Sequence, residues 1–340
     1  MADFNPNIPS IARVYDYFLG GKDNFAADRE LGDQLASFVP STPVTLRENK
    51  DFLARAVTWV AEQGISQFID AGAGMPTAPA THETARAVLP GARVAYIDND
   101  PVVLSHLVAL AAHNNTGVTV IDGDVRDTEK ILREVAAGID LNEPAALIMG
   151  SMLHFYAPQD ARDLVARYVA ALAPGSYVIL TMGIASGEGA EKFFRRYSES
   201  AAKLYQHKPD DFATFFGPLE LVPPGIGDAR TWRPGWQEPA ALPDREGWMI
   251  VGIARVSCVR SAAPLSDTRG DAVEEAVEAK LEFGLGAEVV GFDDAAGEVG
   301  VGPVADDAAD VGRHGGSPLL LGQAGAAKGL HLGQFAGYRA

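Results

Sequence analysis

The ten residues ISQFIDAGAG, at positions 65–74, carry the clearest fold signal in the chain. Their first six form a short apolar run that ends in an acid, which is typical of a buried β-strand. Gly72 and Gly74 follow in a loop, where the absence of a Cβ lets the backbone turn tightly and approach a ligand closely. The stretch therefore predicts a strand that leads into a ligand-facing loop.

Apolar runs of the same kind recur along the chain and alternate with longer helix-like stretches. Strands are expected at 65–70, 93–98, 118–121, 145–149, 176–182, 219–222 and 248–256, and helices at about 79–89, 101–113, 128–137, 159–172 and 188–205. Strands that alternate with helices of this length predict an α/β fold whose mostly parallel sheet is covered by helices on both faces. No clear helix separates the last two strands, which allows the final strand to be antiparallel.

Ligands of such sheets bind beyond the carboxyl ends of the strands, close to the point where the strand order switches. The expected carboxyl ends lie at Asp70, Asp98, 121–124 and 150–156. The site is therefore expected in these loops.

The glycine loop differs from the common phosphate-binding patterns. Thr77 occupies the position of the third glycine in G-x-G-x-x-G, and the chain has no G-x-x-x-x-G-K-[ST] segment. Asp70, two residues before the first glycine, suits a ligand with a positive amine or sulfonium better than a pyrophosphate. An ordinary strand-to-helix turn is the alternative interpretation of the loop taken alone.

Two further acids follow the next two strands. Asp98 lies where a carboxylate can accept hydrogen bonds from both hydroxyls of a ribose, and Asp124 lies where one can accept from the amine of an adenine. Either acid alone could equally be a helix cap or a solvated loop residue. Three acids at successive strand ends, beside a Gly-x-Gly loop, favour a nucleoside-binding site.

Several segments together are similar to the Rossmann-like S-adenosylmethionine-dependent methyltransferases: FIDAGAG (68–74), YIDNDPVVL (96–104), GDVRD (123–127) and SMLHFY (151–156). More narrowly, residues 3–256 resemble a bacterial S-adenosyl methyltransferase family that includes proteins described as a domain of unknown function. This closer resemblance rests on NPNIPSIARVYDYFLGGKDNFAADRE (5–30), GAGMPTAPATHE (72–83) and YIDNDPVVL.

The resemblance implies a methyltransferase fold with a seven-stranded sheet and S-adenosyl-L-methionine as cofactor. By position, Gly72 and Gly74 should cradle the methionine and ribose part, Asp98 the ribose diol, and Asp124 with the Val125 amide the adenine. The remaining cofactor-binding candidates are Asp70, Asn99, Ser151, Lys22 and Arg13. Ala71 and Ala73 stand where family members more often have glycine or a small polar residue, which removes possible side-chain contacts.

Methyl transfer from a sulfonium needs an acceptor positioned in line with the methyl group, and a base only if the acceptor must lose a proton first. His154 and Tyr156, just after the fourth strand, are the candidates for such a base. The alternative is that His154 packs or caps the loop and that the aromatic residues only wall the cofactor.

The N-terminal block combines Tyr17, a third catalytic candidate, with the turn Gly20-Gly21-Lys22-Asp23-Asn24. Folded over the cofactor, this block would act as a lid that excludes water. Lys22 could then pair with the methionine carboxylate, with Arg13 as a second choice. The alternative is a helix that ends at the two glycines, followed by a solvated charge pair.

Composition divides the chain into three zones. Residues 1–64 are expected to form an N-terminal helical lid or extension, and residues 65–256 the S-adenosylmethionine-binding domain. Residues 262–340 hold 15 of the 36 glycines and carry a net charge of −8. Apart from a helix-like piece at 271–283, this acidic Gly/Ala/Asp-rich tail is expected to be mostly disordered, because it has little apolar surface to bury.

The net charge of −17 argues against a nucleic-acid partner and against docking on anionic membranes, since both need clustered cations. A single cysteine, Cys258, excludes an internal disulfide and a cysteine-based metal site, and no metal site is expected from the histidine spacing. With neither a signal peptide nor a run of about 20 apolar residues, the sequence predicts a soluble, cytoplasmic protein.

The sequence thus predicts an S-adenosylmethionine-dependent methyltransferase that acts on an oxygen or nitrogen atom, with a small-molecule acceptor as its partner. The alternative is a non-catalytic protein that binds or senses S-adenosylmethionine. A nicotinamide dehydrogenase, suggested by the fold alone, is disfavoured by the missing third glycine and by Asp70.

Overall fold

The computed structural model describes residues 5–112, 116–236 and 246–257. The acidic tail at 262–340, with the helix expected at 271–283, lies outside the described residues. Everything described below belongs to one compact unit, Met1–Leu265.

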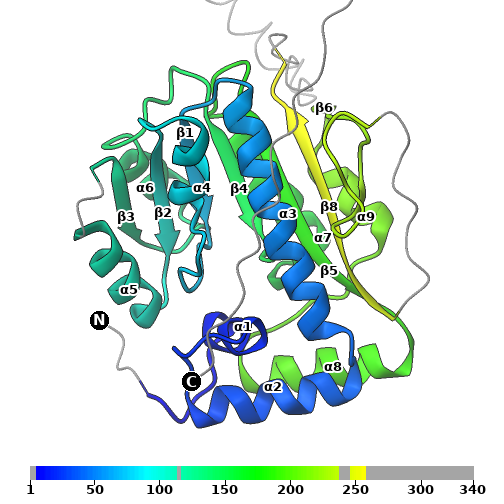
Figure 1. Ribbon diagram of the computed structural model, residues 1–340. Helices are drawn as coiled ribbons and strands as arrows, with labels where there is room; N and C mark the ends of the chain where they lie inside the picture. The colour runs from blue at the N-terminus through cyan, green and yellow to red at the C-terminus, as the bar shows by residue number, and fades with distance from the viewer. Residues whose placement is uncertain (1–4, 113–115, 237–245, 258–340) are drawn as a thin grey trace, which may run out of the picture. The chain divides into compact units, whose positions relative to one another are not determined.

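A single mixed sheet forms the centre of this unit (Figure 1). Its strands follow the order β3-β2-β1-β4-β5-β8-β6, and β7 also pairs with β8. The strands are β1 (Gln67–Ala71), β2 (Arg93–Asp98), β3 (Val118–Asp122), β4 (Ala146–Gly150), β5 (Tyr177–Ala185), β6 (Glu220–Leu221), β7 (Gly227–Asp228) and β8 (Gly247–Arg255).

Strands β1 to β5 are mutually parallel, whereas β8 runs antiparallel to β5, β6 and β7. The mostly parallel sheet and the antiparallel final strand agree with the expectation from the sequence. The expected count of seven strands was short by one, because the two-residue β7 carries no apolar run.

Helices cover both faces of the sheet, as predicted (Figure 1). One face packs against α3 (Thr42–Glu62), α4 (Thr81–Val88) and α5 (Pro101–Ala112); the other packs against α6 (Thr128–Val135), α7 (Pro158–Val169) and α9 (Pro209–Phe215). The seven-residue α9 was not expected, because a helix of two turns shows too little periodicity to be recognised.

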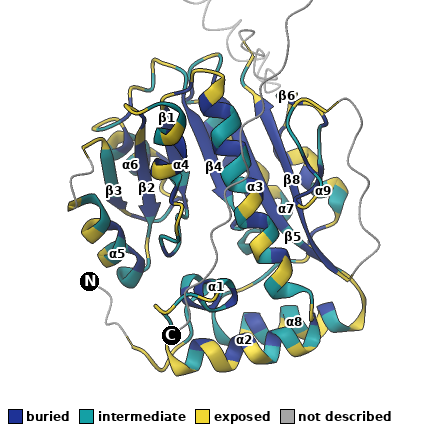
Figure 2. Ribbon diagram, viewed as in Figure 1, coloured by how far each residue is buried: buried dark blue, intermediate teal, exposed yellow. Residues whose placement is uncertain are grey.

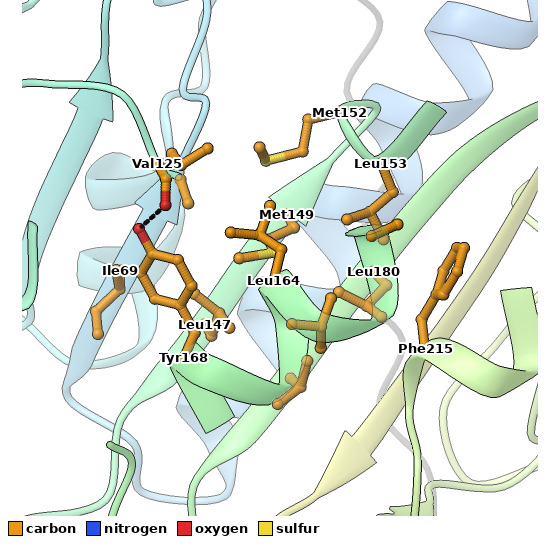
Figure 3. Packing of buried hydrophobic residues seen from close by; sticks show 14 of the residues in the cluster. Ile69, Val125, Leu147, Met149, Met152, Leu153, Leu164, Tyr168, Leu180 and Phe215 are labelled. Atoms are coloured by element: carbon orange, nitrogen blue, oxygen red, sulfur yellow. Dashed lines mark hydrogen bonds between the residues drawn. The ribbon is translucent and has the colours of Figure 1, made fainter. Parts of the chain in front are cut away.

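The alternation of side chains along β4 shows how the sheet builds two cores. Leu147 and Met149 face the α6–α7 side, whereas Ala146 and Ile148 face the α3–α5 side. All four are buried, as are most residues of the central strands (Figure 2). On the α7 side the Tyr168 hydroxyl donates to the Val125 carbonyl at 3.0 Å (Figure 3), so the core reaches the loop that follows β3.

A third cluster joins three helices beside the carboxyl ends of the parallel strands: α1 (Ile11–Leu19), α2 (Ala26–Phe38) and α8 (Gly187–Ser200) (Figure 1). Its buried members are Val14, Phe18, Leu31, Leu35 and Tyr197. The predicted N-terminal helices therefore pack with α8 into a layer next to the expected site.

None of the helices in the described ranges is long and apolar enough to cross a membrane.

Candidate active site

A cavity of about 630 Å³ lies at the carboxyl ends of the parallel strands. The loops after β1, β2, β3 and β4 line it, together with α1 and α3. Strands β1 and β4 are neighbours although two strands separate them in the sequence, so the strand order switches between them. The cavity therefore occupies the position at which parallel α/β sheets bind ligands.

The glycine loop forms the floor of this cavity. Gly72 and Gly74 both have positive φ angles, 73° and 65°. A Cβ at Gly72 would lie 3.3 Å from the Met152 sulfur, whereas one at Gly74 would meet nothing within 4 Å. The amides of Gly72 and Ala73 donate to the Ile97 carbonyl, which fixes the loop against β2. A side chain at either glycine would be strained or would enter the space left for a ligand.

Asp98, at the end of β2, holds the glycine loop from the other side. One carboxylate oxygen accepts from the Gly74 amide at 2.9 Å, and the other accepts from the amides of Asn99 and Asp100 at 2.8 and 2.9 Å. Burial raises the pKa of Asp98, although these three hydrogen bonds act to lower it. Each carboxylate oxygen has two lone pairs, so the oxygen bound to Gly74 can accept a further hydrogen bond from a ligand hydroxyl.

Asp70, at the end of β1, also lines the cavity. It accepts a hydrogen bond from the Thr81 hydroxyl at 2.6 Å. Burial raises the pKa of Asp70 to about 6; Thr81 and the charge of Lys50 oppose this shift, and Asp98 adds to it. Burial thus disfavours the ionised form of Asp70, and a positively charged ligand group beside it would favour that form.

Lys50, on α3, brings a positive charge to this part of the cavity. Its ammonium donates to the carbonyls of Thr77 and Pro79 at 2.7 and 3.0 Å. Burial lowers its pKa, while Asp70 and Glu83 counteract that effect. Lys50 thus fastens the loop between β1 and α4 to α3.

The loop after β3 contributes Asp124 and Val125. Arg126 pairs with both carboxylate oxygens of Asp124 and lowers its pKa. The Val125 amide, in contrast, has no hydrogen-bond acceptor among the described residues. An adenine amine would share the Asp124 carboxylate with Arg126, and the Val125 amide is available to a ring nitrogen.

Ser151 follows β4 and has a left-handed backbone, with φ of 53°. Its amide donates to the Thr181 carbonyl and hydroxyl at 3.1 and 2.9 Å, which holds this conformation. The Asn49 amide donates to the hydroxyls of Ser151 and Tyr15, at 3.0 and 2.9 Å. Asn49 Oδ1 is buried and has no partner within the described part of the chain.

A second, smaller cavity of about 120 Å³ adjoins the first. The two cavities share four lining residues: Ile11, Tyr15, Ser151 and Phe155. His154 lines the second cavity, whereas Tyr156 lines the first. The two cavities therefore adjoin at Tyr15 and Ser151, so that molecules bound in them would face each other at these residues.

His154 is a neutral imidazole in this environment. Its Nδ1 is buried without a hydrogen-bond partner in the described ranges, and burial, with a contribution from His207, lowers its pKa to about 3. Burial raises the pKa of Tyr156 to about 12. With a pKa near 3, His154 is only a weak base, and with a pKa near 12, Tyr156 stays protonated at neutral pH. Neither group is therefore suited to take a proton from an acceptor.

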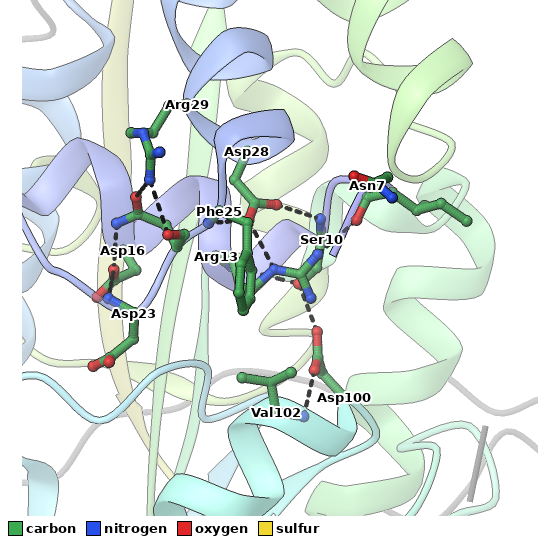
Figure 4. Close-up of polar contacts among 12 residues, drawn as sticks. Asn7, Ser10, Arg13, Asp16, Asp23, Phe25, Asp28, Arg29, Asp100 and Val102 are labelled. Atoms are coloured by element: carbon green, nitrogen blue, oxygen red, sulfur yellow. Dashed lines mark hydrogen bonds and ion pairs between the residues drawn. The ribbon is translucent and has the colours of Figure 1, made fainter. Parts of the chain in front are cut away.

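Three residues expected at the site lie away from both cavities. Arg13 is buried and donates to Asp28 at 2.8 Å and to the Ile8 carbonyl at 2.6 Å (Figure 4). The Tyr17 hydroxyl donates to Asp33 at 2.6 Å, and Lys22 is exposed. None of these three lines either cavity. The structure thus brings together the other expected residues, from Asp70 to Tyr156, but not Arg13, Tyr17 and Lys22.

The two glycines before Lys22 serve to end α1. Gly20 has φ of 80°, and its amide donates to the carbonyls of Asp16 and Tyr17. A Cβ at Gly21 would lie 1.9 Å from the Asp16 carboxylate, which accepts hydrogen bonds from the Asp23 amide and the Asn24 side chain. The turn is therefore the helix C-cap given as the alternative above, and it wraps around Asp16.

Sequence reasoning missed Tyr15, Asn49 and Lys50. On α1 the apolar positions Ile11, Val14 and Phe18 define one face, and Tyr15 belongs to that face whereas Tyr17 does not. Asn49 lies between Thr45 and Phe52 on the buried stripe of α3. A polar residue on the apolar stripe of a helix was the signal that could have identified it.

A model of the S-adenosyl methyltransferase family matches residues 2–257. The chain belongs to this family. Its cofactor is S-adenosyl-L-methionine, as expected from the resemblance. No curated protein matches the chain in a sequence search.

Two solved structures support the family membership. A proposed methyltransferase from Thermobifida fusca is 41% identical, with a TM-score of 0.68 over 74% of this chain and 96% of its own. A DUF574 family protein from Streptomyces avermitilis is 35% identical, with a TM-score of 0.67 over 74% and 98% of the two chains.

The larger cavity fits the cofactor of this family. Positive φ at Gly72 and Gly74 leaves open backbone beside Asp98, and the Val125 amide lacks a partner among the described residues. Asp70 offers a carboxylate to a cationic group. These are the donor and acceptor types that a nucleoside joined to an amino acid requires.

Proposed function

We propose that this protein transfers the methyl group of S-adenosylmethionine to an oxygen or nitrogen atom of a small molecule. The observation that carries the proposal is the pair of adjoining cavities, one with the polar groups that the cofactor needs and one without them. A cofactor-binding protein that only senses its ligand has no need of the second cavity.

In this proposal the larger cavity positions the cofactor. Asp98 binds the ribose hydroxyls, the glycine loop with Gly72 and Gly74 lies along the ribose and methionine part, and Val125 and Asp124 bind the adenine. Asp70 binds the cationic amine. When bound, S-adenosylmethionine supplies an electrophilic methyl group on a sulfonium.

The chain's own contribution to the reaction is positioning and exclusion of water. Part of the N-terminal segment lines the cofactor cavity, which supports its proposed role as a lid: Pro9, Ser10, Ile11, Ala12, Tyr15, Asp16 and Leu19. Tyr15, Asn49 and Ser151 hold one another at the junction of the two cavities. These contacts fix the place at which an acceptor atom meets the methyl group.

His154 and Tyr156 act in this account as neutral walls and hydrogen-bonding groups. The acceptor is therefore expected to be nucleophilic without prior loss of a proton to either residue. Under this mechanism the rate does not fall as pH decreases from 8 to 6 through titration of His154, because its pKa lies near 3.

The test is formation of S-adenosylhomocysteine by the full-length protein in the presence of cell extract. The extract is divided by dialysis into a small-molecule fraction and a macromolecular fraction, and each is supplied with S-adenosylmethionine. Product formation that depends on the small-molecule fraction supports the proposal. Product formation with the macromolecular fraction alone contradicts it, and so does the absence of product with both fractions.

A further inference from the structure

The chemistry of the smaller cavity restricts the acceptor that the protein can hold. Aromatic and aliphatic side chains from α1, α3, α8, β5 and β8 form its walls. The aromatic lining residues are Tyr15, Phe18, Phe155, Phe193, Phe194, Tyr197 and Trp248. Among the residues that the structure describes, no Asp, Glu, Lys or Arg side chain lines it.

The size of the cavity corresponds to a single ring. Its volume of about 120 Å³ is close to that of an apolar protein cavity of about 150 Å³ that binds benzene. Aromatic rings that line such a space favour a flat partner, since they pack in stacked or edge-to-face arrangements. Phe193 already stacks on Tyr197 with ring centroids 6.0 Å apart, and Phe155 packs on the same tyrosine in a tilted arrangement.

The described residues also give this cavity no counter-charge. Its titratable groups are His154, Tyr15 and Tyr197, and burial disfavours the charged form of each. An ion that enters an apolar site without a partner loses its hydration and gains no ion pair in return. An uncharged molecule pays no such penalty, and the polar groups Thr42, Thr45, Ser151 and His154 can still orient it.

We infer that the methyl acceptor is an uncharged molecule with one flat ring, which occupies the smaller cavity and presents a hydroxyl or neutral amine at Tyr15 and Ser151. This inference rests on the proposed function and names the substrate class for it. A bond forms from the acceptor atom to the methyl carbon while the carbon–sulfur bond breaks, and its electron pair remains on sulfur. The methylated acceptor then releases its proton to solvent.

Gly183, on β5, provides a way to fill the cavity without disturbing its walls. It lines the cavity, its φ is not in the left-handed region, and a Cβ added there would meet nothing within 4 Å. Gly91 is a matched control: a Cβ there also meets nothing, and it lies in an exposed turn that lines neither cavity.

The experiment measures binding of two ring compounds to the full-length protein saturated with S-adenosylhomocysteine. The probes are p-cresol and 4-hydroxybenzoate, which share a phenol and differ in a methyl group against a carboxylate. We expect p-cresol to bind more than about tenfold tighter, because the carboxylate finds no partner in the cavity. Gly183→Val should weaken p-cresol binding more than about tenfold while Gly91→Val leaves it unchanged.

The affinity for S-adenosylhomocysteine, measured for every variant, separates the possible failures. If it is retained while 4-hydroxybenzoate binds as well as p-cresol, or while neither probe binds, the inferred substrate class is wrong and the proposed function stands. If the wild-type protein does not bind S-adenosylhomocysteine, both are contradicted. Gly183→Ala provides a smaller version of the change should the valine variant fail to fold, and it should weaken p-cresol binding by a smaller factor.

Discussion

Asp98 joins two loops of the cofactor cavity, since it accepts from the amides of Gly74, Asn99 and Asp100. Replacing it with Asn removes the charge and one acceptor oxygen. We expect Asp98→Asn to weaken S-adenosylmethionine binding by about 1.5–3 kcal/mol, the usual contribution of hydrogen bonds to a charged group. Isothermal titration calorimetry measures this change.

The matched control for Asp98 is Asp140, an exposed acid that likewise accepts a hydrogen bond from the amide two residues later. Asp140→Asn should leave cofactor affinity unchanged, because Asp140 does not line the cavity. Equal affinities for the wild-type protein and Asp98→Asn would remove Asp98 from the ribose site.

Asp70 predicts a pH dependence of cofactor binding. Its pKa of about 6 is raised from the usual value, so folding favours the protonated form; the stability that this form contributes is present below about pH 4 and is lost as pH rises through 6. A cationic ligand favours the ionised form instead. Affinity should therefore fall as pH decreases below about 6, by at most about tenfold per pH unit.

Calorimetry between pH 5 and 7 checks this dependence, since the cofactor's own carboxyl is a stronger acid that stays ionised throughout this range. Asp70→Asn should bind more weakly and with little dependence on pH. The same variant separates Asp70 from Asp98, whose pKa burial also raises. A pH slope that persists in Asp70→Asn would show that another group is responsible.

The position of α1 depends on a buried ion pair between Arg13 and Asp28, and Ser10 adds a hydrogen bond to Asp100 at 2.5 Å (Figure 4). Removing one partner of a buried pair leaves the other without compensation. We expect Arg13→Ala to lower the free energy of unfolding by about 3–5 kcal/mol. Urea denaturation followed by circular dichroism measures it.

Arg29→Ala is the control for this element. Arg29 is exposed, and within the described part of the chain its side chain donates hydrogen bonds only to Asn24. Its effect on stability should be within about 0.5 kcal/mol. If Arg13→Ala instead left stability unchanged and weakened cofactor binding, Arg13 would have the ligand-binding role that the sequence suggested.

At the scale of elements, the sequence was informative where apolar runs are long. Strand β2 has its expected bounds, β3 ends one residue later than expected, and α7 begins one residue earlier and ends three residues earlier. The two-residue β7 and the short α9, in contrast, leave no periodic signal in the sequence. The acids at the strand ends could be placed from the sequence, because the carboxyl ends of parallel strands lie at the same edge of a sheet. Arg13 could not, because its partner Asp28 comes from another helix and only tertiary packing brings them together.

At the scale of the whole molecule, the family match ends at residue 257 and β8 ends at Arg255. The sequence of residues 262–340 has little apolar periodicity with which to pack on a sheet. A chain shortened after residue 261 should therefore keep its melting temperature within about 2 °C, which corresponds to less than about 1 kcal/mol. A drop of several degrees in differential scanning calorimetry would show that the acidic tail stabilises the fold.

The central claim is that the cavity at the carboxyl ends of the parallel strands holds S-adenosylmethionine. Its most direct test is calorimetry of the full-length protein with S-adenosylmethionine, S-adenosylhomocysteine and reduced nicotinamide cofactor in parallel. We expect micromolar binding of both adenosyl ligands, one per chain, weakened in Asp98→Asn, and no binding of the nicotinamide. Folded protein that binds neither adenosyl ligand would contradict it.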